Sequence, residues 1–197
     1  GPIPVRRHKS ETWSPLQVAF NQSCLDSGYP ETYDHNSPDS TGIGPFPMNN
    51  PDGVRMSTAL TYINPNRHRL NLTIRANVQV RRILFDGQRA TGVEVDSGGD
   101  RFIVESGVIV LSAGAIASPQ LLMLSGIGPE SQLQSLGIPV VKNLPGVGQN
   151  LRDHPLVAVR VAVKDDFPLD PNAPRMQALL RYTAAGSQHR EDMQIFP

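Results

Sequence analysis

Apolar and polar side chains alternate along two segments near the middle of the chain, residues 70–74 and 78–83. Alternation with a period of two residues is typical of a β-strand that buries one face. Two turn signals follow, Asp86-Gly87 and residues 97–100, and each separates two further segments with apolar side chains. The pattern therefore predicts a meander of three antiparallel strands that ends near residue 105.

The segment after the predicted meander has a different pattern. Residues 107–111 are apolar without alternation, which favours a strand buried on both faces of a parallel sheet. Gly114 then predicts a tight turn, and Ser118 and Pro119 predict the N-cap and first position of a helix that ends at Gly126. Such a turn at the end of a parallel strand can bind a phosphate or dinucleotide, but plain strand–helix packing can also explain it.

The two ends of the chain contain further predicted elements. Ser14 and Pro15 predict the start of a helix that stops at Gly28. Residues 29–53 are rich in Pro, Gly, Asn and Asp and predict a long loop, either a lid or binding loop or an irregular surface excursion. Alternation returns at residues 156–163, which predict another strand.

Composition narrows the possible classes of protein. The 197 residues contain 18 Lys and Arg and 18 Asp and Glu, so no net charge attracts nucleic acid. The apolar segments are too short to span a membrane, and no Cys/His cluster has the spacing of a metal site. The only cysteine, Cys24, excludes an internal disulfide and favours a reducing compartment, which we take to be the cytoplasm. Because the chain starts Gly1-Pro2 without Met or a signal peptide, we expect an internal piece of a longer protein.

Several motifs in the same order resemble one known family. Residues 113–128 (AGAIASPQLLMLSGIG) are similar to the second signature of the glucose-methanol-choline (GMC) oxidoreductases. Residues 144–155 (LPGVGQNLRDHP) resemble the choline dehydrogenase-like branch of that family. Residues 53–63 (GVRMSTALTYI) and 72–83 (LTIRANVQVRRI) also fit, so the resemblance covers nearly the whole chain.

The resemblance implies a fold, a cofactor and a reaction. FAD would lie across a doubly wound, Rossmann-like domain, and flavin would take hydride from a small alcohol. By this analogy Val78 would present backbone groups to the adenine, and Ala113 and Gly114 would lie against the diphosphate or ribityl part of FAD. Residues 149–155 would run near the flavin ring, where we interpret His154 as a structural, cofactor-side residue and not as a catalytic one.

The family's domain plan gives an α+β or α/β fold in three regions. Residues 1–53 would form a helix and long loop on the substrate side, and residues 54–150 would be part of the FAD-binding domain. Residues 151–197 would start the sheet-based substrate domain. The open edges of the meander are candidates for contact with a second copy of the chain.

Two functional features of the family are absent from the sequence. No Gly-x-Gly-x-x-Gly turn follows a strand, and the late catalytic histidine pair has no counterpart. We therefore expect the isolated chain to lack FAD and activity, with no catalytic residue of its own. The alternatives are a non-oxidising flavin-fold relative, similar to hydroxynitrile lyase, and a separate binding module.

Overall fold

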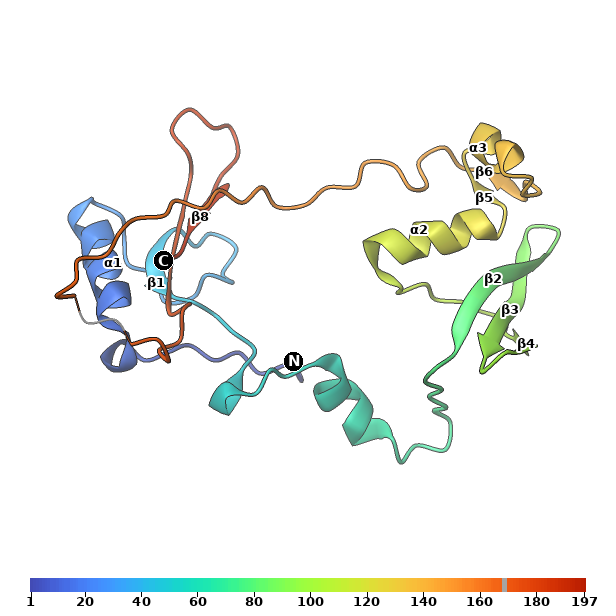
Figure 1. Cartoon of the computed structure of the whole chain (residues 1–197), viewed down its shortest axis with the longest axis horizontal. Helices are drawn as coiled ribbons and strands as arrows, with labels where there is room; N and C mark the ends of the chain where they lie inside the picture. The colour runs from blue at the N-terminus through green and yellow to red at the C-terminus, as the bar shows by residue number, and fades with distance from the viewer. Residues whose placement is uncertain (168–169) are drawn as a thin grey trace. The chain divides into compact units, whose positions relative to one another are not determined.

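The computed structural model of the chain describes residues 1–167 and 170–197. It divides into two compact units, one made of residues 1–72 and 160–197 and the other of residues 73–159 (Figure 1). Among the described residues, no helix combines the length and hydrophobicity needed to cross a membrane. The same residues contain no group of three side chains placed to hold a metal ion.

The first unit packs one helix, α1 (Pro15–Asp26), against a small antiparallel sheet. The sheet has the order β1-β7-β8, with β1 at Gly42–Pro45, β7 at Ala178–Tyr182 and β8 at Met193–Ile195. The helix starts at Pro15 after an extended Ser14, and Gly28, just beyond its end, has a φ of +87°. Both predicted ends are therefore confirmed. The core between α1 and the sheet contains the buried side chains of Cys24, Ile43, Ala178 and Leu180.

Strand β1 corrects the prediction that residues 29–53 form only a loop. Ile43 accepts a hydrogen bond from the Thr32 amide at 2.8 Å and donates to the Pro30 carbonyl at 2.9 Å. A Cβ on Gly42 or Gly44 would lie 2.0 or 1.7 Å from the carbonyl oxygens of Pro30 and Thr32. The glycines that suggested a loop are thus needed for the close approach of two backbone segments.

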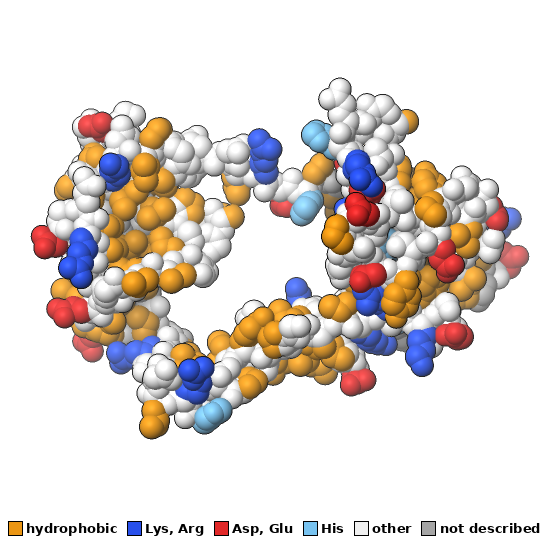
Figure 2. All heavy atoms as spheres, turned by 180° about the vertical axis from the view of Figure 1, so that it is seen from behind, with side chains coloured by type: hydrophobic (Ala, Val, Ile, Leu, Met, Phe, Trp, Pro, Cys, Tyr) orange, Lys and Arg blue, Asp and Glu red, His pale blue; other side chains and the backbone are white. Residues whose placement is uncertain are grey.

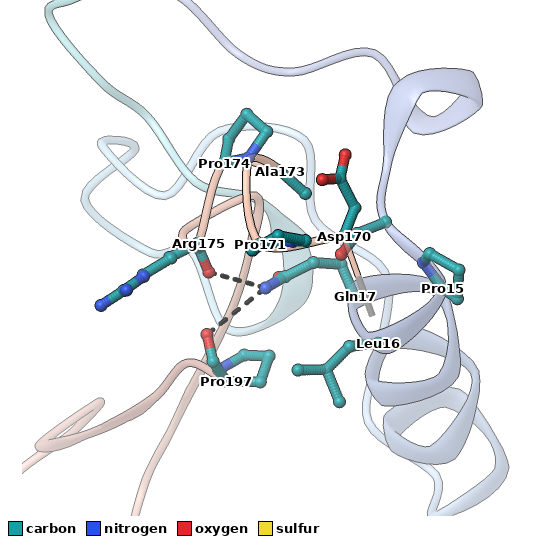
Figure 3. Close-up of a pocket in the computed structure, with 10 residues that line it drawn as sticks. Pro15, Leu16, Gln17, Asp170, Pro171, Ala173, Pro174, Arg175 and Pro197 are labelled. Atoms are coloured by element: carbon teal, nitrogen blue, oxygen red, sulfur yellow. Dashed lines mark hydrogen bonds between the residues drawn. The ribbon is translucent and has the colours of Figure 1, made fainter. Parts of the chain in front are cut away.

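Two buried glutamines connect α1 to β7. Gln17 donates from Nε2 to the carbonyls of Arg175 (2.7 Å) and Pro197 (3.3 Å), at the pocket shown in Figure 3. Gln177 donates from Nε2 to the Thr12 carbonyl at 3.1 Å. Because both side chains are only 1% exposed, these hydrogen bonds satisfy polar groups that water cannot reach.

The rest of the first unit contains short helical turns. They are the 3-10 helices η1 (Ser10–Thr12), η2 (Pro51–Gly53) and η4 (Asn64–Asn66), and the π-helix η3 (Ala59–Ile63). The strand predicted at residues 70–74 is wrong. Leu70 is fully exposed, at 103%, and no strand is assigned there, so the alternating side chains have no sheet to face.

The second unit contains the predicted meander. Strands β2 (Gln79–Asp86), β3 (Arg89–Ser97) and β4 (Asp100–Glu105) pair antiparallel in that order, as the two turn signals predict. The pairing of β2 with β3 has register shifts between Val80 and Arg82 and between Leu84 and Phe85. The unit continues with α2 (Gly114–Leu124), β5 (Ile127–Gly128), α3 (Glu130–Ser135) and β6 (Lys142–Asn143), and β5 and β6 are parallel.

Two predicted strands do not form. Residues 107–111 and 156–163 are assigned to no strand. Val108 and Val110 are 78% and 81% exposed, and Val159 is 84% exposed. A strand needs a paired neighbour, and neither segment has one within the part of the chain that the structure describes. Figure 2 shows hydrophobic side chains at the surface of the unit formed by residues 73–159.

Candidate functional site

Helix α2 begins earlier than the sequence predicts. Its N-cap is Ala113 and its first residue is Gly114, whose φ is +85°. Ser118 and Pro119 therefore lie inside the helix, and the prediction that they start it is wrong. The Ser118 hydroxyl instead accepts a hydrogen bond from the Ala113 amide at 3.0 Å. Pro119 has no N–H to donate within the helix, so its ring interrupts the regular hydrogen-bond ladder.

Gly114 leaves the start of α2 open to an approaching group. No atom lies within 4 Å of the position that a Cβ would take at this glycine. The positive φ disfavours any other residue, because a side chain strains the left-handed backbone. Ala113 and Gly114 are both exposed, and the first amides of a helix have no acceptor within it. A cofactor could therefore contact the backbone closely here.

Ser125 joins the end of α2 to the meander. Its hydroxyl accepts a hydrogen bond from the Ile83 amide at 2.8 Å and donates to the Leu121 carbonyl at 2.6 Å. Ser125 and Ile83 are 6% and 5% exposed. The serine of the Ser-Gly-Ile-Gly sequence thus fixes the helix on strand β2, a role that the sequence analysis missed.

The two glycines of the same sequence allow the chain to return beside α2. A Cβ on Gly126 would lie 2.4 Å from the Pro139 carbonyl oxygen, and the φ of Gly126 is +84°. The Gly126 carbonyl accepts hydrogen bonds from the amides of Val141 (2.8 Å) and Lys142 (3.1 Å). At Gly128, a Cβ would lie 2.9 Å from Cγ of Met123. Close backbone approach therefore accounts for glycine at position 126, and tight contact with the Met123 side chain accounts for glycine at position 128.

This return brings residues 148–152 next to α2 and forms a groove of about 760 Å³. Its lining combines apolar side chains, two glutamines and one cation: Ala115, Ile116, Pro119, Gln120, Met123, Gly148, Gln149, Asn150, Leu151 and Arg152. Asn150 has a φ of +57°, and its Oδ1 accepts a hydrogen bond from Nε of Arg152 at 2.9 Å. Asparagine tolerates the left-handed conformation better than other residues with side chains, which explains its place in this turn.

The structure brings together only some of the residues predicted from the sequence. Ala113 and Gly114 lie at the start of α2, the helix that forms one wall of the groove. Val78 is half-buried just before β2, and neither it nor His154 lines the groove. His154 is exposed, and its amide donates to Oδ1 of Asp153 at 2.7 Å. Its ring has no hydrogen-bond partner among residues 1–167 and 170–197, so the cofactor roles of these four residues stay predictions.

The residues present at the groove fit a flavin dinucleotide in their chemistry. Gly114, at the start of α2 beyond the groove lining, allows close backbone contact, and the groove itself offers both apolar surface and amide donors. Large cofactors bind in such clefts, which are mostly apolar with a few polar groups that fix orientation. The glycine turn in the sequence indicated this site. The sequence did not indicate Gln120, Asn150 or Arg152, because only folding brings these residues together.

Comparison with known proteins identifies relatives of the chain. The family model described as GMC oxidoreductase matches residues 1–156. Mitochondrial choline dehydrogenase of Homo sapiens is 47% identical over 152 residues, which cover 77% of this chain and 26% of that protein. An uncharacterized GMC-type oxidoreductase of Rhodococcus erythropolis is 46% identical over 158 residues, or 80% of this chain and 32% of its own. The chain thus spans between a quarter and a third of the length of these relatives.

Solved structures show the same fold. Pyridoxine 4-oxidase from Mesorbium loti has a TM-score of 0.81 and 32% identity, covering 100% of this chain and 38% of its own. An FAD-dependent oxidoreductase from Chaetomium thermophilum has a TM-score of 0.72 and 31% identity, covering 78% and 27%. The expected fold class, mixed helices and small sheets that make up part of a flavoenzyme, is confirmed.

Proposed function

The chain belongs to the GMC oxidoreductase family, and from this membership we propose that the whole protein is an FAD-dependent oxidoreductase that oxidises the CH–OH group of a small alcohol. The family match over residues 1–156 carries the proposal. The 47% identity to human mitochondrial choline dehydrogenase supports choline or a related alcohol as substrate. FAD, when bound, supplies the ring that accepts the hydride.

In this proposal the chain contributes contacts to the cofactor but no catalytic residue. The backbone of Ala113 and Gly114 lies against the diphosphate or ribityl part of FAD, where the open space at Gly114 permits close approach. Val78 presents its backbone groups to the adenine. Residues 149–155, with His154, lie on the flavin side, and the turn at Asn150 lies where residues 149–152 run beside α2.

The three regions expected from the sequence are part of the same proposal. Residues 54–150 belong to the FAD-binding domain, while residues 1–53 and 151–197 contribute to the substrate side. The compact units have different bounds, since residues 54–72 lie in the same unit as the N-terminal helix. The test is to destabilise each unit in turn by a core substitution in the whole protein and to measure the bound FAD. The unit whose loss removes FAD is the one that the cofactor contacts.

We further propose that the 197-residue chain by itself retains no FAD and oxidises no alcohol. The Gly-x-Gly-x-x-Gly turn that holds a pyrophosphate at a helix N-terminus has no counterpart in its sequence. The check is to incubate the purified chain with excess FAD, remove free cofactor by gel filtration, and record the visible spectrum. A stoichiometric flavin spectrum in the protein peak would contradict this part of the proposal.

The test of the function uses the whole protein under anaerobic conditions. It is mixed with choline and with a panel of primary alcohols while the absorbance of bound flavin is followed. We expect at least one alcohol to bleach the flavin, because hydride transfer reduces it. A protein that binds FAD but stays oxidised with every alcohol would instead support a non-oxidising relative of the hydroxynitrile lyase kind.

Two further properties belong to the proposal. The thiol of Cys24 is 6% exposed, and burial raises its pKa, so it stays unreactive. We propose the cytoplasm as its compartment, because a single cysteine forms no internal disulfide. The outer strand β4 exposes Ile103 (59%) and Val104 (44%), and we propose that a second copy covers this edge. Cell fractionation of the whole protein tests the location. Sedimentation tests the contact between two copies, for which we expect the mass of a dimer.

A further inference from the structure

His35 is buried in the first unit without a fixed hydrogen bond. Its side chain is 6% exposed, and neither Nδ1 nor Nε2 has a partner within hydrogen-bond geometry. The carbonyls of Gly44 and Leu179 face the ring, and these two residues are opposite each other in the pairing of β1 with β7. The imidazole therefore lies against this strand pair and connects the loop of residues 34–41 to it.

Arg181, on β7, holds the backbone of the same loop. Its Nη1 donates to the His35 carbonyl at 3.3 Å and to the Ser40 hydroxyl at 3.2 Å. Ser40 is 7% exposed, and Nε of Arg181 is buried without a partner. One guanidinium thus contacts the loop at two points, so a second positive charge on His35 would be placed close to it.

The charged groups around His35 come from three parts of the unit. Arg181 lies on β7, Asp34 precedes His35 in the loop, and Arg7 in the N-terminal segment forms an ion pair with Asp34. Strand β1, with the sequence Gly-Ile-Gly-Pro, contributes no charge. Burial lowers the pKa of His35 below its ordinary value; the Gly44 carbonyl opposes this shift and the charge of Arg181 adds to it.

We propose that residues 34–41 are an acid-released latch. Neutral His35 closes the loop over β1 and β7, and a protonated ring leaves the interior because it cannot be solvated there beside Arg181. Opening the loop uncovers the β1–β7 strand pair at Gly44 and Leu179, which the closed loop covers. The first unit thus has a pH-controlled surface on β1 and β7.

The sign of the effect follows from the direction of the shift. Because the folded-state pKa of His35 is lowered, closure is fully favoured above about pH 6.5, the ordinary histidine value, and weakens as the pH falls towards the folded-state pKa. Asp34 titrates in a separate range. The Asn36 amide and then Arg7 lower its pKa, so its carboxylate stays charged over the range in which histidine titrates.

The experiment compares the chain with His35→Gln and with His68→Gln as control, since His68 is exposed. Hydrogen exchange is measured between pH 7.5 and 5.0 for peptides from residues 33–41, corrected for the intrinsic pH dependence of exchange. Proton NMR follows the ring of each histidine over the same range. We expect loop exchange in the unmodified chain to rise by up to about tenfold per pH unit as the pH falls from about 6.5 towards the folded-state pKa of His35, and to level off below it.

The expected results separate a latch from general acid unfolding. The control should open as the unmodified chain does, whereas His35→Gln should lose the pH dependence. If His35→Gln does not fold, the unmodified chain still tests the proposal. The His35 ring must then titrate below the ordinary histidine value, and loop exchange must level off in the pH range where that ring becomes protonated. Three results would overturn the proposal. They are loop exchange that does not change with pH, a His35 ring that titrates at the ordinary histidine value, and an unchanged pH dependence in His35→Gln.

Discussion

Gln17 and Gln177 connect the same helix and strand in opposite directions. Oε1 of Gln17 accepts a hydrogen bond from the Ala178 amide on β7 at 2.9 Å, and Oε1 of Gln177 accepts one from the Ser14 amide before α1 at 2.7 Å. Each side chain is 1% exposed. The packing of α1 on its sheet therefore depends on two polar side chains as well as on the apolar core.

Replacing Gln17 with Ala should destabilise the first unit by roughly 1–3 kcal/mol, because the Ala178 amide and two carbonyls lose a buried partner. Gln22→Ala on the same helix is the matched control. Gln22 is exposed and bonds only to Asp26, so its loss should cost less than about 0.5 kcal/mol. Urea unfolding midpoints give both values, and equal costs would show that the buried bonds contribute nothing.

Ser125→Ala should weaken the attachment of α2 to strand β2 of the meander. The substitution leaves the Ile83 amide without its acceptor, at a cost of roughly 1–3 kcal/mol. Ser135→Ala removes an exposed hydroxyl on α3 that donates to the Gln132 carbonyl, and it serves as the control. Amide exchange at Ile83 should become faster in Ser125→Ala and stay unchanged in Ser135→Ala. Protection of Ile83 in both variants would mean that another group holds this strand.

Gly126→Ala should be more harmful than Gly137→Ala. Both glycines have positive φ, +84° and +69°, so both variants have a backbone strain of about 1–2 kcal/mol. Only at Gly126 would the new Cβ also meet the Pro139 carbonyl, whereas no atom lies within 4 Å at Gly137. The extra cost should be about 1–3 kcal/mol, measured by thermal or urea unfolding. Similar stabilities would show that residues 139–142 move away without loss.

The sequence predicted the elements whose signals are local. Asp86-Gly87 and residues 97–100 fixed the turns of the meander, and Ser14, Pro15 and Gly28 fixed the ends of α1. These signals depend on neighbours in the chain, so they need no knowledge of tertiary packing.

Elements that depend on distant partners could not be predicted in this way. Residues 107–111 have the composition of a buried strand, but pairing depends on a neighbouring strand that no local pattern reveals. Ser118-Pro119 was a misleading local signal, since Gly114 starts the helix and the serine hydroxyl bonds back to Ala113. The burial of Gln17 and His35 follows from packing between segments far apart in sequence.

The candidate site was predictable in part. The motif at residues 113–128 indicated Ala113 and Gly114, and the structure places both on the wall helix of the groove. The motif gave no indication that the Ser125 hydroxyl bonds α2 to β2. It also gave no indication that Asn150, with a positive φ, forms the turn in the groove wall opposite α2. Those roles require the return of residues 139–152 beside α2, which only the folded chain shows.

The most direct test of the central claim, that the start of α2 faces the cofactor, is the flavin content of Gly114→Val in the whole protein. The control is Gly87→Val, because Gly87 also has a positive φ, +59°, and open space around it, but lies in the β2–β3 turn. We predict that Gly114→Val folds with little bound FAD, that Gly87→Val keeps its flavin, and that His154→Ala loses only a modest part of its turnover. Full flavin occupancy in Gly114→Val together with abolished turnover in His154→Ala would contradict the account.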